Sequence, residues 1–455
     1  MFRRLTTLAA LLGAASLSAC ATGADMTPVN APRAAAAVTA VPAGVPVPAD
    51  RGLEGEVVAL AFSGGGARAA AFSYGVLLEL RDRRRPDGVR WIDRLAFVTS
   101  VSGGSLTAAW FGLHGPDGLD GFRPALLDKD WHGDIHSSLA WPTNWARLAQ
   151  GGVNGRDRIA DWLDREVYHG ARLSDLTGPP VLLNAVELMT GTPFVFAEPW
   201  MDALCSDLGE VRVADAVAAS AAYPFGMRPV VLGAHGETCD RPLPDWVNEA
   251  AAERNGPVVV RDTARAFQMF RDPERLAYVH LLDGGIVDNY GLSGIAVIQR
   301  ASGLPYGPLM GPGDAVGIRR LRVIVVNAER GAERPWGQAP DGPDGVQVLG
   351  TVADHFVDGI KRNAYDALLG HLERWERDTI AWRCALTPED AAALGASEGW
   401  DCADLDYTLE VIAFADLSPE RAQPLLAIPT RLSLPAQQVD LAIQAGRDLV
   451  AGRLR

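Results

Sequence analysis

The chain of 455 residues has few cysteines, an excess of acidic over basic side chains and no long hydrophobic run beyond its first 20 residues. Its formal net charge is −14, which argues against nucleic acid as a partner and against electrostatic docking on anionic lipid. A membrane-spanning helix needs about eighteen uninterrupted apolar residues, and we expect none in the body of the protein. With 48% hydrophobic residues, the chain can bury a substantial core in one large domain with appendages.

The N-terminus has the features of a secretion signal. A basic start is followed by a short apolar stretch at residues 5–17, and the segment that ends in Cys20 resembles a bacterial lipobox. We therefore expect residues 1–19 to be a signal peptide and Cys20 to carry the lipid. The alanine at position 21 favours, by analogy, an outer-membrane lipoprotein facing the periplasm. A plain signal peptide without lipid is the alternative. The stretch 20–54, rich in Ala, Pro and Val, predicts an extended tether.

Four cysteines remain besides the one in the lipobox. An even number in an oxidising compartment permits two disulfides, in three connectivities. Closeness in sequence favours Cys205 with Cys239 and Cys384 with Cys402, and four reduced cysteines are the alternative.

A candidate nucleophile follows a short apolar strand pattern at residues 95–99. Ser102 comes directly after it and precedes an apolar helical pattern at residues 106–111, so the order is strand, sharp turn, helix, as in a nucleophile elbow. Gly103 lets the chain turn tightly and lets a substrate approach. The elbow pattern has a glycine where Ser100 stands here. The alternative is a simple turn in which Ser102 caps the helix.

A glycine-rich loop lies between another apolar strand pattern, residues 57–62, and a run of helix formers at residues 69–80. Exposed N–H groups at the start of a helix bind anions. The loop therefore predicts an oxyanion site, formed by Gly64, Gly65 and Gly66.

The same loop matches the G-x-G-x-x-A form of the dinucleotide fingerprint. In that interpretation Glu79 or Asp82 would contact the ribose. It leaves Ser102 and Asp283 without a role. A kinase-type phosphate loop is favoured even less, because no Gly-Lys-Ser/Thr follows the glycines.

A candidate base ends the strand pattern at residues 278–282, where Asp283 precedes two glycines. Active sites in open α/β sheets gather at the carboxyl ends of strands. His280 would point to the opposite face of a regular strand, and the other histidines have no recognisable triad context. The simplest assignment is a direct pair of Ser102 and Asp283, which we expect at the ends of neighbouring strands. A surface turn is the alternative for the Asp-Gly-Gly segment.

Together these segments resemble the patatin-like phospholipases over roughly residues 55–330. That family carries an oxyanion loop with a basic residue after it, a serine elbow, an Ala/Ser-rich segment ending in proline, a central strand pair and an Asp-Gly-Gly/Ala motif. In this chain the corresponding segments are residues 64–68, Ser102, residues 218–224, residues 181–196 and residues 283–289. The sequence departs from the family pattern at Ser100 and Ala69.

The resemblance implies a three-layer α/β/α core with a mostly parallel sheet, an acyl-ester hydrolase activity, and no metal or other cofactor in catalysis. Ser102 would attack the ester, Asp283 would accept its proton, and the loop glycines with Gly103 would stabilise the oxyanion. Arg68 would lock the loop, meet a phosphate or form a structural ion pair. The competing hypothesis is a non-catalytic lipoprotein that uses the fold for binding or scaffolding.

Two regions extend this core. Residues 114–175 contain four tryptophans, which predict either an acyl-chain groove or lid, or an added helical layer. His132 and His136 lie one helical turn apart in this region, but no third metal ligand is evident. We expect residues 331–455 to form an extension that covers the core. Its elements are an amphipathic helix from Val352 to Trp375 and a late strand at residues 407–414.

Overall fold

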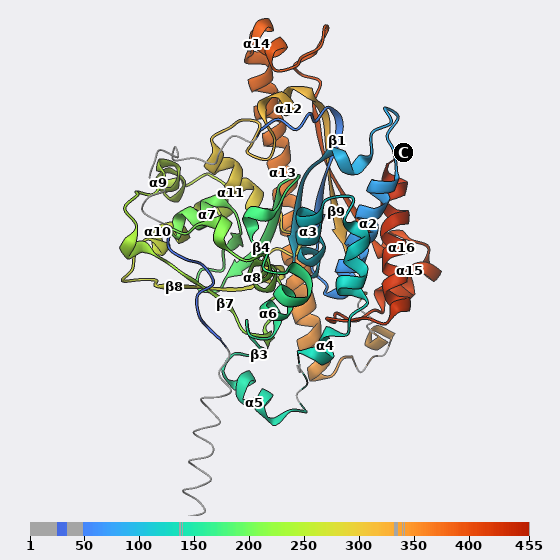
Figure 1. Cartoon of the computed structure of the whole chain (residues 1–455). Coiled ribbons are helices and arrows are strands. Elements are labelled where there is room, and N and C mark those ends of the chain that lie inside the picture. Colours follow the sequence, from blue (N-terminus) through green and yellow to red (C-terminus); the bar gives the residue numbers. More distant parts are fainter. Residues whose placement is uncertain are drawn as a thin grey trace, which may run out of the picture.

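The structure is a computed structural model that describes residues 25–33, 49–135, 138, 140–331, 335–338, 340 and 342–454 (Figure 1). Its main sheet has eight strands in the order β10-β9-β1-β2-β4-β8-β7, with β5 paired to β4. The strands are β1 Gly55–Phe62, β2 Leu95–Val101, β4 Val181–Glu187, β5 Pro193–Val195, β7 Val230–Gly233, β8 Tyr278–Asp283, β9 Ile318–Asn327 and β10 Asp406–Ala413. A separate pair is formed by β3 Gly152–Asn154 and β6 Phe225–Met227.

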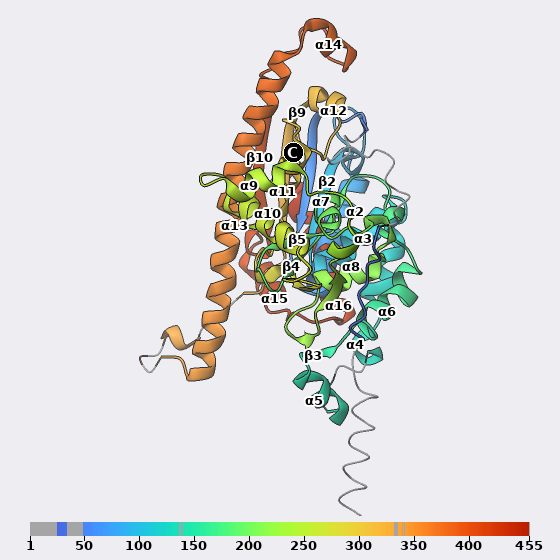
Figure 2. The same cartoon turned by 90° about the vertical axis from the view of Figure 1, so that its left-hand side faces the viewer.

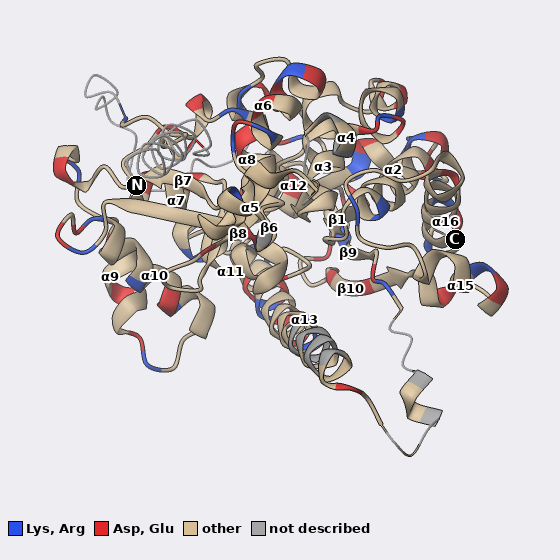
Figure 3. Ribbon diagram, turned by 90° about the horizontal axis from the view of Figure 1, so that it is seen from below, with Lys and Arg blue, Asp and Glu red and all other residues tan. Residues whose placement is uncertain are grey.

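Helices cover both faces of the main sheet, so the expected three-layer α/β/α architecture is confirmed. The longer helices are α2 Ala67–Asp82, α3 Gly103–His114, α8 Val213–Ser220, α10 Val258–Phe270, α11 Ser293–Ser302, α13 Gly345–Ala385 and α16 Ala436–Arg453. The others are α4 Trp131–Asp134, α5 Pro142–Ala149, α6 Ile159–Leu163, α7 Glu198–Ala203, α9 Asp245–Ala252, α12 Pro312–Gly317, α14 Pro388–Ala393 and α15 Pro419–Leu426. Seen along the sheet, α2, α3 and α8 lie on one face, and α11 and α13 lie on the other (Figure 3).

The sheet is mostly parallel because its central strands are buried on both faces. Strands β10, β9, β1, β2 and β4 run in one direction. In β2 every residue is buried, and β1 is buried from Val57 to Phe62. Such continuous apolar runs suit strands that are covered by helices on both sides. Strands β8 and β5 are antiparallel to β4, which proves important for the active site.

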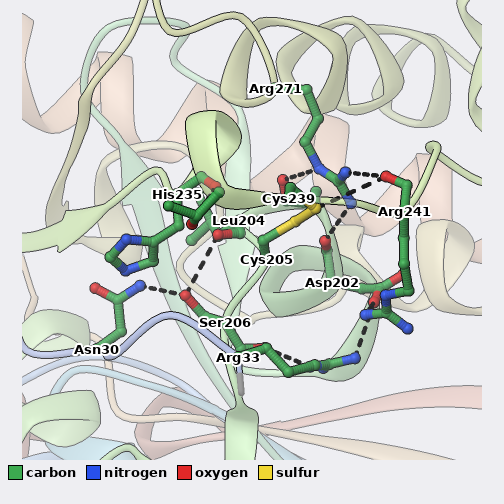
Figure 4. The surroundings of a disulfide bond; sticks show 12 residues. Asn30, Arg33, Asp202, Leu204, Cys205, Ser206, His235, Cys239, Arg241 and Arg271 are labelled. Carbon is green, nitrogen blue, oxygen red and sulfur yellow. Dashed lines mark hydrogen bonds and ion pairs between the residues drawn. A yellow bond between two sulfur atoms is a disulfide. The ribbon is translucent and has the colours of Figure 1, made fainter. Parts of the chain in front are cut away.

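Residues 25–33, which precede the main sheet in the sequence, pack against the rest of the protein. Asn30 is buried and exchanges hydrogen bonds with the backbone of Gly233 on β7, at 2.9 and 2.7 Å. Arg33 forms ion pairs with Glu198 and Asp202 at 3.1 and 3.0 Å, beside the Cys205–Cys239 disulfide (Figure 4). The expected tether over residues 20–54 is therefore wrong for residues 25–33. Cys20 and the signal segment lie outside the described residues.

The C-terminal extension contributes to the sheet itself. Strand β10 pairs in parallel with β9 along its whole length, and α16 packs against α2. Helix α13 is longer than expected and runs along the outside of the molecule (Figure 2). Its face is buried at Leu368, Leu372 and Trp375, but Val352 is 60% exposed. The second disulfide joins Cys384, near the end of α13, to Cys402 just before β10. Among the described residues no helix is long and apolar enough to cross a bilayer.

Candidate active site

Ser102 lies in the sharp turn between β2 and α3, with backbone angles φ 53° and ψ −122°. Residues other than glycine rarely adopt a positive φ, and strained backbone of this kind is concentrated at active sites. The Ser102 side chain makes no capping hydrogen bond to α3, although it stands at the N-cap position. The alternative that Ser102 merely caps the helix is therefore wrong, and the geometry is that of a nucleophile elbow.

A buried chain of serine hydroxyls supports this turn. The Ser100 hydroxyl contacts the Ser105 hydroxyl at 3.0 Å and donates to the carbonyl of Leu182 at 3.2 Å. Ser105 contacts Ser220 at 2.9 Å, and the backbone N–H of Ser102 donates to the Ser220 hydroxyl at 2.9 Å. A serine is therefore accommodated where the elbow pattern has glycine, because its hydroxyl joins this network. The sequence alone assigns Ser220 no individual role, although this residue lies within the Ala/Ser-rich segment.

Asp283 lies beside the candidate nucleophile. Its carboxylate accepts the N–H of Gly285 at 2.8 Å, and the hydroxyl of Ser102 is close enough to lower the pKa of this carboxyl group. Burial raises the pKa of Asp283 from an ordinary value of 3.8 to about 6, while the bonds from Gly285 and Ser102 lower it in part. Within the described part of the chain, no histidine is hydrogen-bonded to either residue. The arrangement allows Asp283 to accept the Ser102 proton without an intermediary.

The route by which β8 brings Asp283 to the site differs from our expectation. The two residues do not end neighbouring strands, because β4 lies between β2 and β8. Strand β8 is antiparallel to β4 and pairs only with its last residues, with Asp283 opposite Ala185. The preceding residue of β4, Asn184, lies opposite Val101 at the end of β2. The end of β8 therefore returns to the level at which β2 finishes, and Asp283 meets Ser102 across β4.

The glycine loop approaches Ser102 closely. A Cβ atom on Gly64 would lie 3.3 Å from the Ser102 Cβ and 2.6 Å from Oδ1 of Asn289, so a side chain there would displace Asn289. The N–H of Gly64 donates to the Asn289 carbonyl at 3.3 Å, which removes it from the expected oxyanion donors. The N–H groups of Gly65 and Gly66 meet no acceptor among the described residues. They remain available to an anion.

The second loop of the site, after Ser102, lies directly against the first. A Cβ atom on Gly103 would lie 2.1 Å from the Gly66 carbonyl oxygen, so the two loops pack backbone to backbone. The N–H of Gly103, in the first turn of α3, also meets no acceptor in the described parts of the chain. The structure thus places the turn at Ser102 and Gly103 against the glycine loop, and in the described parts of the chain the N–H groups of Gly65, Gly66 and Gly103 have no acceptor.

Arg68 locks the glycine loop from behind. It is buried, and its guanidinium donates to the carbonyl of Ala328 at 2.8 Å, to the carbonyl of Ile428 and to the Thr430 hydroxyl at 3.3 Å. Burial lowers the pKa of Arg68 to about 10. Of the three roles considered for this residue, the contacts agree with the first. They also tie the C-terminal extension to the oxyanion loop.

The dinucleotide interpretation of the glycine loop is not supported, because another segment of the chain occupies the place of the ligand. A pyrophosphate would have to occupy the N-terminus of α2. The Arg431 carbonyl already accepts the N–H of Ala67 there at 2.8 Å, and it lies only 2.4 Å from where a Gly66 Cβ would be. The Arg431 backbone therefore occupies a position at this helix end that a bound pyrophosphate would need.

The loop after Asp283 is held by two residues whose roles the sequence pattern leaves open. Asp288 accepts four backbone N–H groups at 2.6–3.0 Å, from Tyr290, Gly291, Leu292 and Ser293. Asn289 lies between the two loops, because a Cβ on Gly64 or on Gly285 would come within 2.8 Å of its side-chain oxygen. These contacts fix the Asp-Gly-Gly turn relative to the oxyanion loop, so it is not a plain surface turn.

A large groove of about 1130 Å³ lies elsewhere, between α10, α11, α13 and the turn after β4. Neither Ser102 nor Asp283 lines it, so this groove is separate from the candidate site. No cluster of three metal-ligating side chains is found among the described residues. His136 and the side chain of His132 lie outside them.

Comparison with known proteins gives one family and several solved structures. The family model described as patatin-like phospholipase matches residues 60–295, just over half of the chain. No curated protein matches. Thirteen chains of solved structures match, among them human GIVD cytosolic phospholipase A2, with a TM-score of 0.39 and 12% identity. The match covers 88% of this chain and 61% of that one.

Proposed function

The chain belongs to the patatin-like phospholipase family, and from this premise we propose that it is a lipid acyl hydrolase that works through Ser102 and Asp283. The observation that carries the proposal is the strained turn at Ser102, which the strand register places beside the buried carboxyl of Asp283. The substrates are phospholipids, lysophospholipids or simpler acyl esters.

In the proposed reaction, Asp283 accepts the hydroxyl proton of Ser102 while the serine oxygen bonds to the ester carbonyl carbon. The N–H groups of Gly65 and Gly66, with Gly103, stabilise the negative oxygen of the tetrahedral intermediate. The intermediate collapses, and the leaving alcohol takes the proton from Asp283. Water then attacks the acyl-enzyme and gives a proton to Asp283. Release of the acid returns that proton to Ser102.

The environment of Asp283 suits a base. With its pKa raised to about 6, the carboxylate is ionised at neutral pH, yet it is far more basic than an exposed aspartate. A general base is most effective when its pKa lies near the working pH. Burial, the largest cause of the shift, therefore makes a direct Ser–Asp pair workable without histidine.

We further propose that the enzyme is a lipoprotein anchored through Cys20, in the bacterial outer membrane and facing the periplasm. Cys20 lies outside the described residues, so the support is the lipobox in the sequence. The two disulfides of the structure are consistent with an oxidising compartment.

Labelling with a fluorophosphonate probe tests the activity against the scaffold alternative. We expect the wild-type protein to be labelled, and Ser102→Ala and Asp283→Asn to lose both label and ester hydrolysis. Ser73→Ala is a matched control, because Ser73 is a buried hydroxyl on α2 without a hydrogen-bond partner among the described residues. Absence of label on folded wild-type protein would favour a binding or scaffolding module.

A further inference from the structure

We propose that helix α5 is a membrane-docking element, whose exposed tryptophans Trp141 and Trp145 insert into the interface of a phospholipid bilayer. Docking there holds the mouth of the active site against the lipid surface. This inference rests on the proposed function in one respect: the bilayer to which α5 docks also supplies the lipid substrate.

Helix α5 buries polar side chains and exposes apolar ones, whereas an ordinary surface helix does the reverse. Trp141, at the N-cap position, is 54% exposed, and Trp145, one turn later, is 60% exposed. Ala149, a further turn along, is also exposed. By contrast, Asn144 and Arg147 on the other side are buried, with 0% and 5% exposure. A helix that buries its polar side and exposes its indoles is suited to an environment less polar than water.

Specific polar contacts hold α5 in this orientation. Arg147 donates to the carbonyl of Val153 at 2.6 Å and forms two bonds of 2.9 Å with the carboxylate of Asp157. The oxygen of the Asn144 side chain accepts from Arg158 at 2.9 Å. These charged and amide groups have their hydrogen-bond partners inside the protein, so rotating the helix about its axis would break those bonds. The tryptophans are therefore presented outward on a fixed support.

Trp141 and Trp145 are not among the buried core residues of the protein. The two other tryptophans of residues 114–175, Trp131 and Trp162, are each 3% exposed and stack with ring centres 5.0 Å apart. The expectation of packing thus holds for one pair, and the other pair is left on the surface. Tryptophan is favoured at membrane–water interfaces because its ring is apolar while its N–H can remain hydrated.

Helix α5 is joined to the mouth of the active site. It leads directly into β3, which pairs with β6 through Gly152 opposite Phe225. Strand β6 follows exposed Tyr223. One residue earlier, the Ala222 carbonyl accepts the N–H of Asp283 at 3.0 Å. Figures 1 and 2 show α5 and β3 at the end of the molecule where the parallel strands finish, which is the end that carries the catalytic residues.

The N-terminal segment begins at the same end. Asp25, the first described residue, forms an ion pair of 3.6 Å with Arg156, two residues after β3. Cys20 precedes it by five residues, which span at most about 18 Å when fully extended. A lipid on Cys20 would therefore bring the bilayer to the end of the molecule that carries α5. Because the chain has a net charge of −14, burial of the indoles, and not charge, would supply the attraction.

The test uses the full-length lipidated protein on neutral vesicles of phosphatidylcholine and phosphatidylethanolamine. Lipids brominated in the acyl chains quench tryptophan fluorescence on contact. We expect them to quench the wild type, and the quenched fraction to disappear in the double variant Trp141→Ser/Trp145→Ser. The double variant should hydrolyse vesicle lipid at least tenfold more slowly, while its rate on a water-soluble short-chain ester stays within twofold of wild type. Leu441→Ser, at a 45% exposed position of α16, is the control and should change neither.

Each outcome is decisive. Equal quenching and equal vesicle hydrolysis in wild type and double variant would overturn the proposal. The proposal would also be overturned if the double variant converted a wild-type dimer to a monomer without any effect on quenching. In that case the exposed side of α5 would bind a second copy of the chain. If the wild type is quenched through these tryptophans but hydrolyses neither substrate, docking stands and the proposed hydrolase function fails.

Discussion

At the scale of single residues, the site depends on one buried carboxyl group. Asp283 is 8% exposed, and burial is the largest cause of its raised pKa. The N–H of Gly285 and the hydroxyl of Ser102 stabilise the ionised form and keep the pKa from rising further. The protein therefore keeps an ionisable group in its interior, and ionisation of that group lowers the stability of the fold. Both the activity and the free energy of unfolding should therefore depend on pH.

The activity should depend on ionisation of Asp283. Only the carboxylate can accept the Ser102 proton, so kcat/KM should rise with pH through a midpoint of about 6 and level off above it. A pH profile measured on a soluble ester, whose own ionisation does not change, checks this. A midpoint near 4 would show that the carboxyl is not desolvated in the free enzyme.

The contribution of Asp283 to the free energy of unfolding should fall with rising pH, whereas the activity should rise. Because the folded-state pKa of Asp283 is raised above the unfolded value of 3.8, its contribution to stability is fully present below pH 3.8. It is lost as the pH rises through about 6. Asp283→Asn removes the buried charge, while its amide oxygen can still accept from Gly285. At pH 8 the variant should be more stable by up to about 3 kcal/mol, and the gain should vanish near pH 4. Denaturant unfolding at the two pH values measures it, and an equal effect at both would contradict burial of the charge.

At the scale of elements, two loops and a strand from distant parts of the chain form one site. The turn after β1 supplies the anion donors, the turn after β2 supplies the serine, and the end of β8 supplies the base. The first two turns touch through Gly66 and Gly103, and Asn289 of the third segment fills the space beside Gly64. A change in one loop should therefore be felt in the others.

Gly66→Ala should show this coupling. Gly66 has φ +63°, and a Cβ there would lie 2.4 Å from the Arg431 carbonyl oxygen. The loop would have to shift, so turnover should fall a hundredfold or more through loss of an oxyanion donor, about 3 kcal/mol in the transition state. The clash should also lower the unfolding midpoint.

A matched control separates the clash from backbone strain. Gly115 has φ +62°, and nothing lies within 4 Å of the place where its Cβ would be. Gly115→Ala should therefore lose only about 1 kcal/mol of stability through the strained φ and keep its activity. Comparable activity loss in both variants would show that strain, and not the oxyanion site, causes it.

At the scale of the whole molecule, segments outside the family match complete the enzyme. The match ends at residue 295, yet β9 lies inside the sheet, between β10 and β1. The segment 428–431 holds Arg68 and the N-terminus of α2. In the view of Figure 3, acidic and basic residues are interspersed along the ribbon.

Substitution of Cys20 tests the proposed lipid anchor in the cell. Cys20→Ala should move most of the protein from the membrane fraction to the soluble fraction. Any remainder should be released by adding Trp141→Ser/Trp145→Ser, because α5 would be the second attachment. Membrane fractionation with an immunoblot measures both steps. If Cys20→Ala alone leaves the membrane fraction unchanged, Cys20 is not the anchor.

Much of the candidate site could be predicted because its parts are local in sequence. A buried strand, a glycine turn and a helix occupy consecutive residues, so the patterns around Ser102 and the glycine loop can be recognised without knowledge of the fold. The same is true of Asp283 before two glycines. The cysteine pairs were also predictable, because each pair is close in sequence and few connectivities are possible.

Other features depend on contacts between distant residues, and only the tertiary structure decided them. The position of β8 on the far side of β4 depends on strand register, which the strand pattern around Asp283 does not contain. Packing of Asn30 against β7 depends on a partner about 200 residues away. The four tryptophans of residues 114–175 are the same residue type in one short region. Burial of Trp131 and exposure of Trp145 follow only from which face each helix turns to the core. Composition and spacing thus determine which chemical groups are available, whereas long-range packing decides which of them meet each other and which meet the solvent or the membrane.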